Sequence, residues 1–148
     1  MKNKLRFFLF FIAGLLLVAP VYLQAQTAEE LESILKADYV TWSQAANFIL
    51  RSTDKSFKGS ALEYAAMHGW TRRSAPGDPI TMAELSYLIM KSFNLKGGMM
   101  YSLFPGPRYA YRTMLSRSFL QGACDPSLTV SGERFLIILG RVLSAEGE

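Results

Sequence analysis

Ile80-Thr81-Met82-Ala83-Glu84 is the stretch that decides the fold, because similar stretches occur at residues 40–44 (VTWSQ) and 130–134 (VSGER). Each copy has an apolar residue, then a hydroxyl side chain of the kind that caps helices, and then an amphipathic run. Self-similarity at three places indicates that one small unit is reused. Since a unit of this size cannot bury its apolar face alone, we expect the copies to pack on one another.

The sequence after residue 26 predicts helices along most of its length. We expect helices over residues 28–36, from Thr41 or Ser43 onward, from Ser60 to Gly69, from Thr81 to Gly97, over 109–120, and from Ser131 onward. Thr81 and Glu84 have the spacing of a capping box. No stretch alternates apolar and polar residues as a strand does, so the sequence predicts an all-α fold.

The helices group into one domain of three helix-loop-helix units. The predicted repeats are residues 28–54, 58–95 and 108–145 of a domain over 26–148, with an apolar loop over 96–107. In the second and third repeats a helix ends at glycine, and a loop with Asp-Pro precedes the next helix. If the helices that begin at Thr81 and Ser131 form the shared centre of the fold, Leu88 and Ile138 should be buried. Trp70 is expected to be at least half buried against the helix that follows it.

Residues 65–70 (AAMHGW) and 78–85 (DPITMAEL) resemble the S-layer homology (SLH) domain family. The resemblance covers most of residues 29–145, and the three copies agree with it. It implies a compact pseudo-threefold helical domain and a role in anchoring exported proteins to cell-wall polysaccharide. The family arginine that follows the threonine and reaches anionic glycan is replaced here by Met82, Trp42 and Gly132.

Methionine cannot reproduce the planar donor fork of arginine, so another basic group must hold any anion. Two pairs are candidates: Arg72 and Arg73, which follow Trp70, and Arg108 and Arg112, which are four residues apart and share a helix face. Near the second pair, Tyr109 and Tyr111 could stack on sugar rings. The alternative is that these tyrosines are packing residues and the arginines are ordinary solvated charges.

The first residues resemble a secretory signal. Lys2, Lys4 and Arg6 precede the apolar run 7–18, and cleavage is expected after Ala25, which gives a signal peptide over 1–25. The run is short for a membrane span. An uncleaved anchor is the alternative, and it would be the only expected contact with a membrane. We therefore expect an exported protein of the periplasm or cell envelope.

Charge is unevenly distributed after the signal. The chain has 16 Lys and Arg against 12 Asp and Glu, and the signal holds three of the bases, which leaves 13 against 12. Residues 51–117 carry +6, whereas residues 26–50 carry −3 and residues 118–148 carry −2. A basic middle between acidic ends suits an anionic partner or self-association better than nucleic-acid binding.

The sequence offers little for catalysis, cofactors or metals. Cys124 is the single cysteine and His68 the single histidine, so no internal disulfide and no metal site of ordinary ligand spacing is expected. We expect Cys124 to be a half-buried loop residue, with an intermolecular disulfide as the alternative. His68 is best explained as a helix-end residue, and no nucleophile motif is present.

An unusually apolar segment spans residues 97–107 (GGMMYSLFPGP) and includes Tyr101 and Phe104. It is too apolar for a solvent-exposed loop without a function, and its glycines and prolines exclude a long helix. The segment either folds over the core as a lid or presents an apolar patch to a partner. The leading hypothesis is a noncatalytic, cofactor-free envelope module that binds wall or periplasmic glycan, an envelope protein, or both. The alternatives are a periplasmic protein-interaction subunit that docks through residues 99–112 and, more remotely, a hydrolase of wall polymers.

Overall fold

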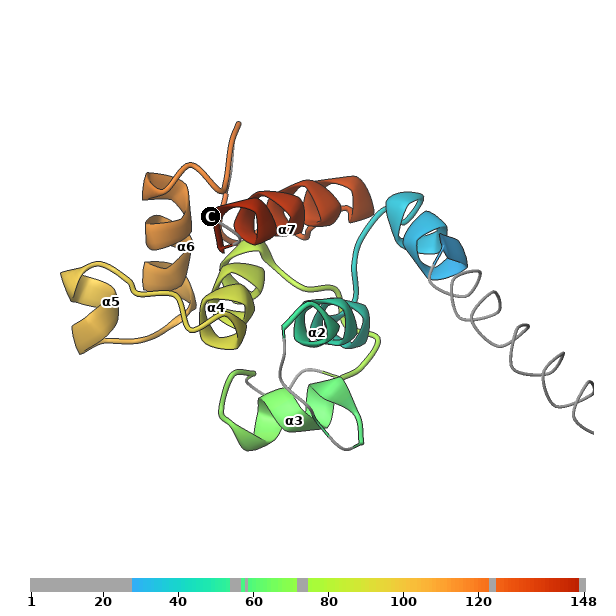
Figure 1. Ribbon diagram of the computed structural model, residues 1–148, viewed down its shortest axis with the longest axis horizontal. Coiled ribbons are helices and arrows are strands. Elements are labelled where there is room, and N and C mark those ends of the chain that lie inside the picture. Colours follow the sequence, from blue (N-terminus) through green and yellow to red (C-terminus); the bar gives the residue numbers. More distant parts are fainter. Residues whose placement is uncertain (1–27, 54–56, 58, 72–74, 123–124, 147–148) are drawn as a thin grey trace, which may run out of the picture. The chain divides into compact units, whose positions relative to one another are not determined.

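The structure of the protein is a computed structural model, which describes residues 28–53, 57, 59–71, 75–122 and 125–146 (Figure 1). The expected signal segment 1–25 and the candidate residues Arg72, Arg73 and Cys124 lie outside these residues. The chain divides into two compact units, Met1–Ile34 and Leu35–Glu148. In the part of the chain that the structure describes, no helix is both long enough and apolar enough to cross a membrane.

The described part of the first unit, residues 28–34, is helical, and the helix continues to residue 35. This agrees with the helix that the sequence predicts over 28–36. Its first turn contains Glu29 and Glu30, whose negative charge is favourable near the positive end of the helix dipole. Leu31 is 44% exposed.

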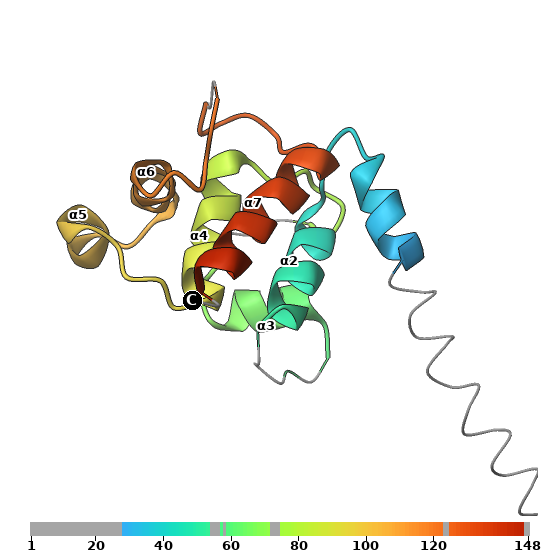
Figure 2. The ribbon, with the colours of Figure 1, turned by 45° about the horizontal axis from the view of Figure 1, so that its top comes forward.

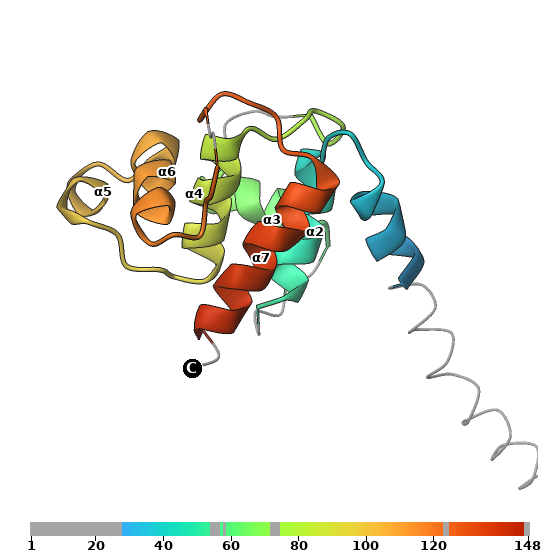
Figure 3. The same ribbon diagram turned by 90° about the horizontal axis from the view of Figure 1, so that it is seen from above.

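The described residues of the second unit form helices joined by loops, which confirms the all-α prediction for them. The helices are α2 (Trp42–Arg51), α3 (Ala61–Met67), α4 (Met82–Ser92), α5 (Met99–Leu103), α6 (Pro107–Ser116) and α7 (Gly132–Glu146). Figures 2 and 3 show α5 at the edge of this unit beside α6, whereas α7 lies over α2 and α4.

The residues just before α2, α4 and α7 are joined by a closed ring of backbone hydrogen bonds. Val40 N–H donates to the Val130 carbonyl (2.8 Å), Val130 N–H to the Ile80 carbonyl (3.2 Å), and Ile80 N–H to the Val40 carbonyl (2.9 Å). All three side chains are fully buried. The first residues of the repeated stretches therefore meet in the core.

A second set of hydrogen bonds links the start of each of these helices to the loop before the next one. Trp42 N–H donates to the Asp78 carbonyl (3.0 Å) and Met82 N–H to the Leu128 carbonyl (2.9 Å). These bonds flank the bridges Thr41–Pro79 and Thr81–Thr129. At the third junction the acceptor is one residue earlier than its equivalents, because Gly132 N–H donates to the Ala37 carbonyl (3.0 Å).

The hydroxyl residues cap the three helices as the sequence predicts. Thr81 and Glu84 form a capping box at α4, and Thr41 forms one with Gln44 at α2. At α7, the Ser131 hydroxyl accepts from the Arg134 N–H at 3.4 Å. Each cap satisfies backbone donors that the first turn leaves free.

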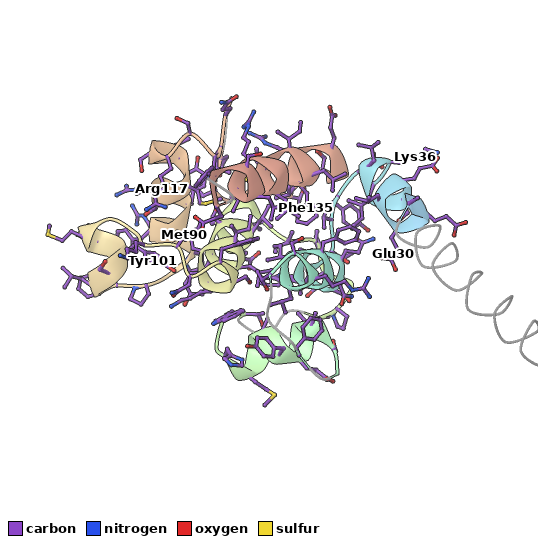
Figure 4. The ribbon with its side chains drawn as sticks, viewed as in Figure 1. Glu30, Lys36, Met90, Tyr101, Arg117 and Phe135 are labelled. Carbon is purple, nitrogen blue, oxygen red and sulfur yellow. The ribbon has the colours of Figure 1, made fainter. Side chains whose placement is uncertain are left out.

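The core is built from the buried faces of α2, α4 and α7, with α6 packed on α4 and α3 packed on α2. Leu88 is fully buried and Ile138 is 2% exposed, which confirms the prediction for both. Figure 4 shows Phe135 on the side of α7 that faces α2, where its ring centroid lies 6.3 Å from that of Phe48, edge to face.

Two predicted helix boundaries were wrong. α4 ends at Ser92 and not at Gly97, because Asn94 takes the left-handed conformation (φ 54°) and stops the helix. α6 spans Pro107–Ser116 and not 109–120: proline is favourable in a first turn, and Ser118 (φ 62°) ends the helix early.

Candidate functional site

Two hollows meet at the loop of residues 105–107, which we call the proline loop. The first, the Trp70 hollow, has a volume of about 120 Å³ and is lined by the proline loop together with Trp42, Gly69, Trp70, Glu84 and Tyr87. The second, the Arg108 hollow, is a more open space of about 970 Å³, lined by the same loop together with Ala83, Leu103, Phe104, Arg108, Tyr109, Pro126 and Ser127. Together they form one surface that runs from Gly69 and Trp70, just after α3, over the first turns of α4 to the start of α6.

Trp70, which lines the Trp70 hollow, belongs to an aromatic cluster at the end of α3. The ring of Trp70 lies 5.7 Å from that of Tyr64 and 5.3 Å from that of His68, centroid to centroid. Trp70 is part-buried, as the sequence predicts. Its place is set by Gly69, whose positive φ (68°) turns the chain at the end of α3, and by Trp70 N–H, which donates to the Ala65 carbonyl at 2.9 Å.

His68 belongs to this cluster. It is the residue at the end of α3, and its Nδ1 lies 2.8 Å from the Tyr64 carbonyl oxygen, one of the last carbonyls of the helix. Its ring centroid lies 4.2 Å from that of Tyr64. This agrees with a helix-end role. Within the described residues, no group of three or more His, Cys, Asp or Glu side chains could hold a metal ion.

The three residues at the position where the resemblance to SLH domains implies an arginine are all buried. Trp42 is 2% exposed and Met82 1% exposed, and Gly132 is buried at the start of α7. These positions serve the core in this chain, although Trp42 also lines the Trp70 hollow. A charged side chain would be costly at any of the three.

Glu84 lines the Trp70 hollow, but its carboxylate is engaged. Its Oε2 accepts from the Thr81 N–H at 3.0 Å and from the Thr81 hydroxyl at 2.7 Å. Capping therefore accounts for this carboxylate without acid-base chemistry.

The structure separates the predicted pair Arg108 and Arg112. Both are exposed on α6, but Arg108 lines the Arg108 hollow, whereas Arg112 lines a groove between α5 and α6 that also includes Met99, Met100 and Tyr101. Tyr109 is part-buried and lines both spaces. The two arginines can therefore be tested separately.

Tyr101 and Tyr111, which the sequence suggests as contact residues, are each only 8% exposed, whereas Phe104 is 62% exposed. The rings of Tyr101 and Tyr111 thus offer little surface for stacking on a ligand, because each is turned toward neighbouring helices. Phe104 is one of the residues that line the Arg108 hollow.

Tyr101 packs α5 against α4. Its ring centroid lies 6.4 Å from that of Tyr87, edge to face, and Lys91 Nζ lies 5.5 Å from the Tyr87 centroid and 5.9 Å from the Tyr101 centroid. Burial, with a smaller contribution from the charge of Tyr87, raises the pKa of Tyr101 to about 12. Tyr101 thus remains neutral over the physiological range.

Asp125 shapes the loop on the far side of the Arg108 hollow. Its carboxylate accepts from the Ser127 hydroxyl at 2.6 Å and from the Ser127 N–H at 2.8 Å. These hydrogen bonds lower the pKa of Asp125, because they favour the charged form. The Asp125 carboxylate therefore stabilises the turn formed by residues 125–127.

Tyr87 and the proline loop were missed from the sequence as parts of the site. Tyr87 lies three residues after Glu84, so the helical period could have placed both residues on the same face of α4. The proline loop was noticed only as part of an apolar segment. Nothing in its sequence indicated that it would lie beside Gly69 and Trp70, more than thirty residues earlier in the chain.

Comparison of the chain with protein-family models, with curated proteins and with solved structures found no match.

Proposed function

We propose that the chain is an exported, noncatalytic cell-envelope module with an SLH-like, pseudo-threefold arrangement of three repeats, and that it binds an envelope glycan along the proline loop. The observation that carries the binding proposal is that the proline loop joins a hollow walled by Trp70 and Tyr87 to a hollow that contains Arg108. Aromatic faces and a nearby cation suit a sugar chain with anionic substituents.

The ring of hydrogen bonds through Val40, Ile80 and Val130 supports the repeat arrangement. Three equivalent residues each donate to one neighbour and accept from the other. Such a ring follows naturally if three similar units pack about a common axis. The shift of one residue at Ala37 falls in the first repeat, which is the shortest of the three in sequence.

The side chains along the proline loop suit a ligand that has apolar ring faces and also carries negative charge. Trp70 and Tyr109 are part-buried, so each keeps a fixed ring with some exposed area. Rigid, partly exposed aromatic rings lose little entropy when they bind. Arg108 is exposed at the first turn of α6, where its guanidinium is available to a carboxylate or phosphate group.

Co-sedimentation with insoluble envelope glycan tests the proposal. The wild-type chain should be retained, and high salt should release it, because the Arg108 contact is exposed and screened by ions. Trp70→Ala and Arg108→Ala should each reduce retention. Arg112→Ala is the matched control, since it removes an exposed arginine from the same helix but outside both hollows.

Equal loss of retention in the Arg108 and Arg112 variants would show that net charge alone governs binding. Retention unchanged in the Trp70 and Arg108 variants would refute the assignment of the surface. Mass determination of the exported protein tests the signal separately: cleavage after Ala25 predicts that the mature chain begins at Gln26.

A second candidate function, docking of an envelope protein through residues 99–112, is favoured by the exposure of α5. Met99, Met100, Leu103 and Phe104 are between 45% and 76% exposed. This is the apolar patch that the sequence left open as an alternative to a lid. Within α5 itself, Tyr101 is the buried residue.

A further inference from the structure

Met99, Met100 and Leu103 of α5, with Phe104 directly after it, form what we call the α5 patch. Leu103 and Phe104 also line the Arg108 hollow, whereas Met99 and Met100 line neither hollow at the proline loop. Met99 is 76% exposed, Met100 45%, Leu103 63% and Phe104 62%. Tyr101 is the buried residue of α5, and α5 itself lies at the edge of the unit (Figures 1 and 4). Clustered exposed apolar residues of this kind mark an interaction surface.

The surroundings of the α5 patch are basic. From residue 85 to residue 124 the sequence contains five Lys and Arg and no Asp or Glu. Lys96, Arg108, Arg112 and Arg117 of this set are exposed. A partner that complements this surface should be apolar at its centre and acidic around it.

The chain itself carries a surface of that description in the helix of residues 28–35, which we call the acidic helix. Leu31 is 44% exposed and Leu35 52% exposed, and their spacing of four residues places them on one helix face. Glu29, Glu30 and Glu32 are exposed in the same helix. Residues 26–50 carry a net charge of −3.

We infer that the acidic helix of one copy of this chain packs against the α5 patch of a second copy. Leu31 and Leu35 would cover the apolar side chains of α5, in the manner of an amphipathic helix on an apolar surface. The glutamates would face the bases that flank the patch. Charge complementarity favours a second copy over other occupants, because both halves of the matching pair are present on one chain.

The two surfaces are different, so the contact is heterologous: each copy can offer its acidic helix to one neighbour and its α5 patch to another. The apolar area involved is small, a two-turn helix against five-residue α5, so the association should be weak, with a dissociation constant of about micromolar size. The inference deepens the protein-docking candidate and does not depend on glycan binding.

Sedimentation velocity of the full chain over about 1 to 100 µM, a range that brackets this affinity, tests the inference. The wild-type chain should show concentration-dependent association. Met99→Glu in the α5 patch and Leu31→Lys in the acidic helix should each weaken association about tenfold or more, since each adds a charge that the facing surface repels. Met67→Glu is the matched control, because Met67 is 85% exposed and belongs to neither surface.

A mixture of the two variants gives the sharpest result. The Met99→Glu chain keeps its acidic helix and the Leu31→Lys chain keeps its α5 patch, so an equimolar mixture should form dimers with near wild-type affinity and nothing larger. Association that arises from the apolar run 7–18 would be the same in every variant. Circular dichroism should be unchanged in both, because each substituted side chain is exposed.

Three results would overturn the inference: a wild-type chain that stays monomeric throughout, association that both variants retain, or a mixture that fails to form dimers. Glycan retention of the same variants keeps the two proposals apart. Met99 lines neither hollow at the proline loop, so Met99→Glu should leave retention intact even where association is lost.

Discussion

Replacing Ile138 by alanine should destabilise the domain by about 2 to 5 kcal/mol. Ile138 is 2% exposed on α7, in the core shared with α2 and α4. The change removes three side-chain carbons, which at about 0.8 kcal/mol each amounts to roughly 2.4 kcal/mol, and any cavity that remains adds to this cost. Urea denaturation followed by tryptophan fluorescence measures the loss, since Trp42 is buried in the same core.

The neighbouring residue supplies a matched control. Ile137 lies on the same helix but is 46% exposed, so Ile137→Ala should cost less than about 1 kcal/mol, because little burial is lost and alanine has the higher helix propensity. Equal effects of the two substitutions, or a cost below about 1 kcal/mol at Ile138, would refute the reasoning that α7 packs its Ile138 face into the core.

Three further predictions concern the cap, the start of α5 and the buried tyrosine. Thr81→Ala should reduce the free energy of unfolding by about 1 kcal/mol, measured by urea denaturation, because α4 loses its capping box. Gly97→Ala should lower the thermal midpoint and Gly98→Ala should not, because a Cβ at Gly97 would lie 2.6 Å from Tyr101 Cβ, whereas one at Gly98 meets nothing within 4 Å. Since the pKa of Tyr101 is raised to about 12, its contribution to stability is complete below pH 10 and is lost between pH 10 and 12. The difference in urea midpoint between wild type and Tyr101→Phe should therefore change between pH 9 and 11, and a constant difference would contradict this.

Local signals in the sequence predicted the helices other than α5, and the caps of α2, α4 and α7. The spacing of Thr81 and Glu84, with the apolar residues that follow, was enough to place the start of α4. The end of α4 could not be placed, because it depends on Asn94, a residue that tolerates the left-handed conformation but does not require it. Gly97 was the stronger sequence signal and the wrong one.

The candidate site was predicted less well, because it depends on contacts between distant segments. Trp70 was found from its place after Gly69. The packing of α6 decides whether Tyr111 faces solvent or the core. The residues next to Tyr111 in the sequence gave no indication of this packing. The division of Arg108 and Arg112 between two spaces depends on α5, a helix too short to be distinguished from a loop by its pattern.

Titration of the protein with soluble fragments of envelope glycan, followed by the indole N–H resonances, tests the central claim most directly. The chain has two tryptophans, so Trp70→Phe assigns both resonances. The Trp70 resonance should shift with added glycan and saturate, and Arg108→Ala should weaken the response more than Arg112→Ala does. Indole resonances that stay in place up to millimolar glycan would contradict the proposed function.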